Sequence, residues 1–151
     1  MRARTHARVA VQKDMNISGP LLDDLIAHAR EEYDAECCGM VAYAPPAPDG
    51  EPLAAKVHRA TNVYASRKRF EIDGLEVLRT LNEFEEAGWE LGAIYHSHTH
   101  TAPYPSQTDI NFAARWPGLE WLIVGLAGDD PEVRCYEIED GKVREVALRV
   151  L

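Results

Sequence analysis

The chain has 151 residues, the usual size of a single domain, and its 46% hydrophobic and 27% charged residues are typical of a globular protein. Its 25 acidic residues outnumber its 16 basic ones, and the net charge of −9 argues against binding to nucleic-acid phosphates. No apolar run reaches the roughly 20 residues that are needed to cross a membrane.

The N-terminal segment is basic, with arginines at positions 2, 4 and 8, but no apolar stretch follows them. A secretory signal needs that apolar stretch, so this segment does not read as one. We expect a flexible leader or an edge strand over residues 1–16, followed by a single domain over residues 17–151.

Three cysteines, Cys37, Cys38 and Cys135, are present, and they form no C-x-x-C pair. An odd number that includes two adjacent residues does not indicate a disulfide framework. We interpret them as small buried side chains, and the cysteine usage favours a reducing cytoplasm.

The first half of the chain predicts one helix and two strands. Gly19 and Pro20 mark a helix start, with Ser18 or Gly19 as the N-cap. Leucine, isoleucine and alanine side chains at helical spacing then give this helix one apolar face. The segments that follow are a buried strand over 38–43, a proline-rich loop over 44–52 and a strand over 54–63.

The second half alternates strands and helices before a run of three strands. The predicted elements are a helix over 75–87, a strand over 90–95, a loop over 101–106, a helix over 108–115, and strands over 120–126, 133–138 and 143–150. Strands interleaved with helices predict an α/β domain with a mixed β-sheet flanked by helices. In such domains, functional residues concentrate at strand ends and in the loops that follow them.

Three histidines occupy alternate positions directly after the strand predicted over 90–95: His96, His98 and His100. Alternate residues of an extended chain share a face, so His96 and His98 can reach one point in space. Asp109 follows a proline-containing loop and could turn back towards them. Zinc is bound by such imidazole and carboxylate groups, and a catalytic site keeps a fourth position for water. Solvated loop histidines are the alternative explanation of this cluster.

The spacing of these residues resembles a known signature. His96 and His98, followed by Ser106 and Asp109, match the pattern H-x-H-x(7)-S-x-x-D of the JAMM (MPN+) metalloproteases. The upstream segment Glu36-Cys37-Cys38-Gly39 resembles the E-x-C-G element of the same family. Two separate elements in the correct order are more specific than either one alone. The resemblance extends from about Ile17 to the C-terminus and is strongest to the actinobacterial CysO-cysteine peptidase subfamily.

This resemblance implies a three-layer, cytidine-deaminase-like architecture and one zinc ion per chain. It implies His96, His98 and Asp109 as metal ligands, Glu36 as the general base and Ser106 as a donor to the oxyanion. It also places Asn62, Arg69 and Phe70 along a substrate groove. His100 is an additional histidine, interpreted as solvent-facing or as a neighbour of the ligands.

Two positions depart from the family pattern, since Asp34 and Thr99 replace prolines. Neither position has a chemical role in the family's site.

The implied substrate is a small ubiquitin-like sulfur-carrier protein with a C-terminal Gly-Gly, from which cysteine would be released in cysteine biosynthesis. The short loops of this chain suit a thin, extended tail of this kind. The implied partners include neither nucleic acid nor a membrane, and a homodimer is kept as an alternative to a monomer.

Other functions stay open at this point. The same site could serve a general deconjugating enzyme or a hydrolase of small amidated metabolites. A non-catalytic MPN scaffold is a further alternative, although such domains characteristically lose the ligands that this chain retains. A zinc nucleoside deaminase would need H-x-E and P-C-x-x-C motifs, and the sequence has neither. The native metal could also be iron or manganese.

Overall fold

The computed structural model describes residues 13–46 and 50–151. Its central sheet has the strand order β3-β2-β4-β5-β6-β7, and within it only β4 and β5 run parallel. The strands are β2 (Cys38–Tyr43), β3 (Ala54–Ala60), β4 (Glu90–His98), β5 (Glu120–Gly125), β6 (Glu132–Glu139) and β7 (Lys142–Val146). The predicted α/β fold with a mixed sheet is thus confirmed.

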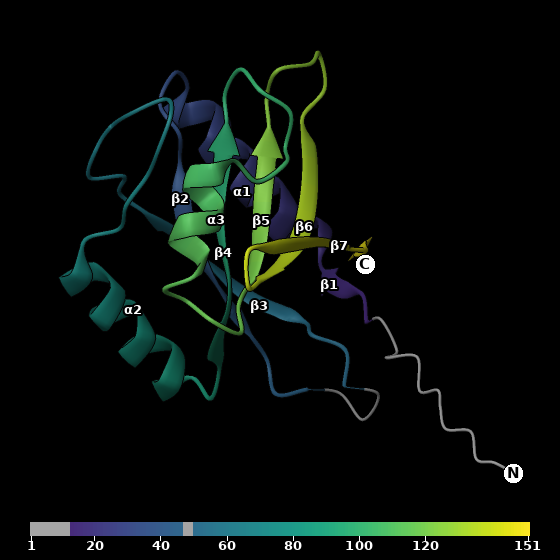
Figure 1. Ribbon diagram of the computed structural model, residues 1–151. Helices are drawn as coiled ribbons and strands as arrows, with labels where there is room; N and C mark the ends of the chain where they lie inside the picture. The colour runs from purple at the N-terminus through teal and green to yellow at the C-terminus, as the bar shows by residue number, and fades with distance from the viewer. Residues whose placement is uncertain (1–12, 47–49) are drawn as a thin grey trace, which may run out of the picture.

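Helices cover both faces of the sheet and make three layers (Figure 1). Helix α1 (Gly19–Glu32) lies on one face, whereas α2 (Gly74–Glu86) and α3 (Gln107–Ala113) lie on the other. Each face of the sheet carries its own hydrophobic core. The core on the α1 face contains Leu25 and Ala29, and the core on the opposite face contains Phe84 of α2 and Ala113 of α3. Side chains that alternate along β4 enter the two cores in turn, because neighbouring strand residues point to opposite faces.

A second, two-stranded sheet joins the two ends of the described chain. Strand β1 (Met15–Ile17) pairs in parallel with β8 (Leu148–Val150). Met15 and Ile17 are fully buried in the core on the α1 side. Of the segment that we expected to be a leader or edge strand, residues 1–12 lie outside the described part, and residues 15 and 16 belong to β1.

Several predicted boundaries were wrong. The single strand expected over 143–150 is broken at Ala147, whose carbonyl accepts a hydrogen bond from Met15 N at 2.9 Å, so β7 and β8 pair with different partners. Strand β4 continues to His98 rather than ending at residue 95, and β3 ends at Ala60 rather than at residue 63. The loop predicted over 44–52 includes residues 47–49, which lie outside the described part.

The start of α1 follows the predicted capping chemistry. Ser18 is the N-cap of α1, and its side chain accepts a hydrogen bond from Leu21 N.

The cysteines Cys37, Cys38 and Cys135 are free and buried, as expected of small core side chains. Among the described residues, the helices are too short or too polar to cross a membrane.

Candidate metal centre

Strand β4 brings two histidines to one face of the sheet. His96 and His98 are both buried, with exposed fractions of 1% and 5%. They alternate with Ser97, whose hydroxyl instead accepts a hydrogen bond from Cys37 N at 2.8 Å. Both histidines are residues of β4 itself, not of a loop after it, so the pairing of the strand in the sheet fixes the direction in which they point.

Helix α3 supplies the third residue of the cluster. Ser106 caps the helix, and its Oγ accepts a hydrogen bond from Asp109 N at 3.1 Å. Ser106 N in turn donates to Asp109 Oδ2 at 2.9 Å, which completes a capping box. The cap fixes the direction of the Asp109 carboxylate. Among the described residues Ser106 Oγ acts only as an acceptor, so its hydroxyl proton remains free to be donated elsewhere.

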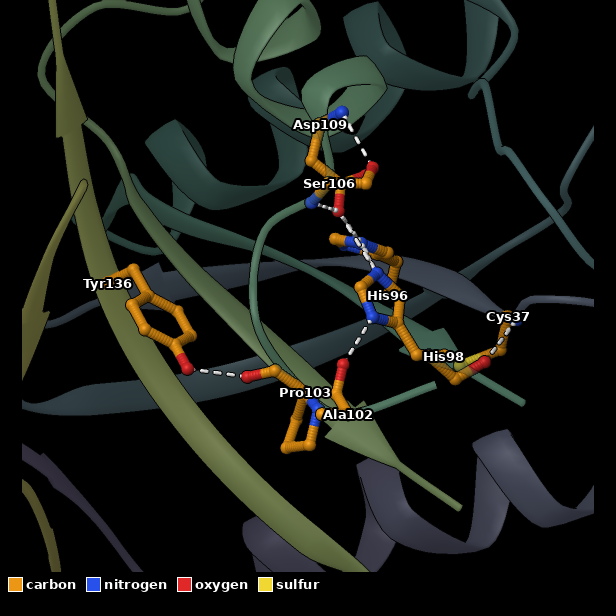
Figure 2. A network of polar contacts seen from close by, with 9 residues as sticks. Cys37, His96, His98, Ala102, Pro103, Ser106, Asp109 and Tyr136 are labelled. Atoms are coloured by element: carbon orange, nitrogen blue, oxygen red, sulfur yellow. Dashed lines mark hydrogen bonds and ion pairs between the residues drawn. The ribbon is translucent and has the colours of Figure 1, made fainter. Parts of the chain in front are cut away.

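The three side chains converge on one point (Figure 2). Asp109 Oδ2 lies 3.1 Å from His96 Nε2 and 3.0 Å from His98 Nε2, and the two Nε2 atoms are 3.3 Å apart. Ligand atoms about 2.0–2.1 Å from a tetrahedral zinc would be separated by roughly 3.3–3.4 Å. The observed triangle is close to one face of such a tetrahedron, and its two imidazoles and one carboxylate fit the donor set of a zinc site with an open position.

The hydrogen bonds of His98 support this fit. His98 Nδ1 lies 2.8 Å from the Ala102 carbonyl, which only accepts, so Nδ1 carries the proton of the neutral ring and Nε2 presents a lone pair. Nε2 then faces the Asp109 carboxylate, an arrangement that needs a shared cation or an added proton. A carbonyl that fixes the tautomer of a ligand is a common feature of metal sites.

The pKa values of the metal-free side chains reflect the same proximity. Burial lowers the pKa of His98, but hydrogen bonds to Asp109 and to the Ala102 carbonyl outweigh it and leave the pKa raised. Burial acts to raise the pKa of Asp109, yet the two histidines and Ser106 N hold it well below its usual range. Asp109 is therefore a carboxylate at neutral pH, as a metal ligand must be.

Glu36 reaches the cluster through strand pairing. In the antiparallel pair of β2 and β4, Cys38 lies opposite His96, and the same register continued by two residues brings Glu36 opposite His98. Reciprocal bonds between Cys37 and Ser97 hold this continuation, with Ser97 N donating to Cys37 O at 3.2 Å. Opposite residues of an antiparallel pair share a face, so Glu36 points towards the histidines.

The environment of Glu36 suits a proton acceptor. The residue is only 4% exposed, and among the described residues no group hydrogen-bonds its Oε1. Burial raises the pKa of Glu36, partly offset by the nearby His96 and His98 and reinforced by the charge of Asp109. Its carboxylate is consequently more basic than that of an exposed glutamate.

Asn62 holds the backbone of Glu36 instead of lining a groove. Its buried amide donates to the carbonyls of Glu36 at 3.1 Å and Arg69 at 3.0 Å. Its Oδ1 accepts hydrogen bonds from the backbone N–H groups of Tyr64 and Glu71. The sequence resemblance placed Asn62 along the substrate groove, and the structure corrects this position.

The remaining predicted residues lie around the cluster. Phe70 is buried and stacks on the His96 ring, with the ring centroids 4.6 Å apart. A cavity of about 290 Å³ borders Asp109 and includes Arg69 and Phe70 in its lining. His100 points away from the cluster, because it is exposed and its Nε2 contacts Asp34 Oδ1 at 2.9 Å.

Comparison with known proteins identifies relatives that match most of this chain. A family model described as prokaryotic homologs of the JAB domain matches residues 18–139. The CysO-cysteine peptidase of Mycobacterium tuberculosis is 33% identical over 138 residues, covering 89% of this chain and 90% of that protein. The desampylase of Haloferax volcanii is 31% identical over 144 residues, covering 90% and 96%. The solution structure of a protein from Desulfitobacterium hafniense superposes with a TM-score of 0.81 at 25% identity, covering 91% and 92%.

Proposed function

Because the chain belongs to the JAB/MPN family, among its prokaryotic JAB members, we propose that it is a zinc-dependent peptidase that cleaves conjugates of a small ubiquitin-like sulfur-carrier protein. The proposed cleavage point is the amide bond at the Gly-Gly end of the carrier, and the proposed released amino acid is cysteine. The observation that carries the proposal is the convergence of His96, His98 and Asp109 within 4.8 Å, with Glu36 on the same face.

His96, His98 and Asp109 would hold the metal through Nε2, Nε2 and Oδ2. When bound, zinc supplies Lewis acidity that makes water nucleophilic near neutral pH and polarises a carbonyl group. The protein fixes the ligand directions before the metal binds, since β4 orients both imidazoles and the cap of α3 orients the carboxylate. Such preformed geometry is what separates a catalytic centre from a chance cluster.

Glu36 is proposed to move the proton during hydrolysis. Its carboxylate accepts a proton from the attacking water as the C–O bond forms, and then passes that proton to the leaving nitrogen as the C–N bond breaks. The buried position and raised pKa of Glu36 favour this role, because a more basic carboxylate is the better proton acceptor. Glu36 N donates a hydrogen bond to Ser66 O, and Glu36 O accepts one from the Asn62 amide, so the backbone of Glu36 is held on both sides.

Ser106 is proposed to stabilise the charge that develops on the carbonyl oxygen. Its cap uses the hydroxyl only as an acceptor, which leaves the O–H available as a donor beside Asp109. A single preorganised donor of this kind raises kcat by a factor of about 10²–10³ in other hydrolases. Ser106 is exposed, so a substrate carbonyl can approach it.

The names of the relatives support a protein conjugate as the substrate. One relative is named a CysO-cysteine peptidase, and another is named a probable TtuB-protein conjugate cleaving protease. The desampylase relative supports a second candidate, a general deconjugating enzyme that uses the same site. The two functions differ in the leaving group, which is a free amino acid in the first and a protein amine in the second.

The test compares three substrates with the zinc-loaded enzyme. These are a Gly-Gly sulfur carrier extended by cysteine, the same carrier joined to a lysine side chain, and a short dipeptide. We expect the first to be cleaved fastest, and comparable rates on the dipeptide would contradict a protein substrate. Glu36→Gln should keep its zinc but lose about 10²–10⁴ in rate. Glu32→Gln, a change at an exposed position of α1, is the matched control.

A further inference from the structure

The cavity beside Asp109 is flanked by two guanidinium groups. Its volume is about 290 Å³, and Arg69 and Arg115 belong to its lining together with Asp109 itself. Arg69 comes from the loop before α2, and Arg115 lies just after α3. Two separate parts of the fold thus place positive charge next to the candidate metal centre.

Both guanidiniums are held by aromatic rings instead of carboxylates. The Arg69 Cζ lies 3.9 Å from the centroid of the Tyr64 ring, and the Arg115 Cζ lies 5.1 Å from that of Phe112. A guanidinium stacked on a ring face keeps its N–H donors, which lie in its plane, available for an anion. Tyr64 and Phe112 also line the cavity, so the stacking fixes the two arginines at its edge.

Neither guanidinium is neutralised within the part of the chain that the structure describes. Glu71 shares the lining, but its carboxylate accepts a hydrogen bond from Tyr64 and forms no ion pair with either arginine. The chain is strongly acidic, and several described arginines outside the cavity are paired: Arg59, Arg67, Arg134, Arg144 and Arg149. Two unpaired cations at one cavity are therefore suited to an anionic group of a ligand.

We propose that Arg69 and Arg115 bind the α-carboxylate of the amino acid that the enzyme releases. This inference rests on the proposed hydrolysis and specifies its leaving group. The α-carboxylate is attached to the carbon next to the scissile nitrogen, so its binding group must border the metal centre, as this cavity does through Asp109. A lysine side chain in an isopeptide bond has no carboxylate at that distance. The enzyme would thus act on carriers that end in one added residue.

A carboxylate could also come from an acidic side chain in the carrier tail, and three peptides distinguish the two sources. They are acetyl-Leu-Gly-Gly-Ala as the free acid, the same peptide as its C-terminal amide, and acetyl-Asp-Gly-Gly-Ala amide. Binding is measured by NMR titration of the zinc-loaded Glu36→Gln protein, which does not depend on turnover. We expect the free acid to bind at least about tenfold more tightly than its amide, as charge-assisted hydrogen bonds allow.

The double variant Arg69→Gln with Arg115→Gln, made in the same background, should lose this preference. Arg79→Gln removes an arginine of α2 that lies outside the cavity, and it should keep the preference. A preference that persists in the double variant assigns the carboxylate to the metal and overturns the inference. Equal binding of the free acid and its amide, or tight binding of the aspartate peptide, overturns it as well. Failure of the wild-type enzyme to hydrolyse carriers is a separate result that concerns the proposed function.

Discussion

Ser97 and Cys37 are joined by two hydrogen bonds that tie the end of β4 to the segment carrying Glu36. Ser97 Oγ accepts from Cys37 N at 2.8 Å, and Ser97 N donates to Cys37 O at 3.2 Å. Ser97 lies between the two histidines in sequence but points away from them. Its side chain therefore extends the β2–β4 register by one residue and sets the distance between Glu36 and the metal centre.

Replacing Ser97 by Ala should weaken both stability and catalysis. The buried Cys37 N–H would lose its acceptor, which costs about 1–3 kcal/mol of the free energy of unfolding. Urea unfolding measures this change. The rate should fall while the zinc content stays unchanged, because no ligand is altered. Ser66→Ala is the control, since the Ser66 Oγ contact within the described part of the chain is a hydrogen bond from the exposed Lys68 N. A Ser97→Ala protein with unchanged stability would contradict the structural role.

His98 and His100 should differ in their effect on metal binding. His98→Gln removes the buried ring nitrogen Nε2, a proposed metal ligand that lies 3.0 Å from Asp109 Oδ2, so stoichiometric zinc binding should be lost. His100→Gln removes an exposed ring that contacts Asp34, and this variant should retain about one zinc per chain. Elemental analysis after dialysis separates them. Loss of zinc in both variants would show that His100 takes part in the site.

Metal removal should lower the melting temperature of the wild-type protein. A ligand at 100 times its dissociation constant stabilises the folded state by about 2.7 kcal/mol. For a chain of this size, that corresponds to roughly 5–10 °C. Calorimetry with and without a chelator measures the shift. The His98→Gln variant should melt at the same temperature in both conditions, and a chelator-sensitive variant would disprove the ligand assignment.

The local signals in the sequence were sufficient for the elements that they govern. Ser18 and Pro20 correctly predicted the start of α1, because capping depends on adjacent residues. The alternation of His96 and His98 correctly predicted a common face, because strand geometry has a period of two. These features need no knowledge of distant parts of the chain.

Contacts between distant segments could not be predicted in this way. Strand β1 has only three residues, too few for a periodic pattern, and its partner β8 comes from the other end of the described chain. The position of Glu36 opposite His98 depends on strand register, which the sequence alone did not supply. The buried position of Asn62 could not be predicted for the same reason, since its amide bonds the carbonyl of Glu36 in a separate segment as well as that of Arg69 in its own loop.

Asn62→Asp should reduce activity without removing the metal. The Asn62 amide donates to the carbonyls of Glu36 and Arg69, and a carboxylate in its place would face them without a proton to donate. Leaving these buried acceptors unpaired costs about 1–3 kcal/mol for each group. We expect a lower kcat with unchanged zinc content. Asn82→Asp, at an exposed position of α2, makes the same chemical change away from the site and should behave as the wild type.

His28 should make the stability of the metal-free protein depend on pH. Its Nδ1 lies 2.7 Å from the hydroxyl of Tyr95, which connects α1 to β4 inside the protein. Burial lowers the pKa of His28, and the charge of Arg59 adds to this effect against the nearby carboxylates. Between the lowered pKa and the ordinary value of about 6.5, the unfolded chain therefore binds a proton that the folded chain does not.

The sign of the effect follows from this difference. The unfolded state gains the proton as the pH falls below about 6.5, so the stability decreases by up to about 1.4 kcal/mol per pH unit until the folded pKa is reached. His28→Gln has no such proton to bind. Its stability at pH 8 should be about 1 kcal/mol lower, because the bond to Tyr95 is changed. Between pH 6.5 and 5 its stability should decrease less steeply than that of the wild type. Urea unfolding of both proteins in a chelator measures the two slopes, and parallel slopes would show that His28 binds its proton equally well in the folded protein.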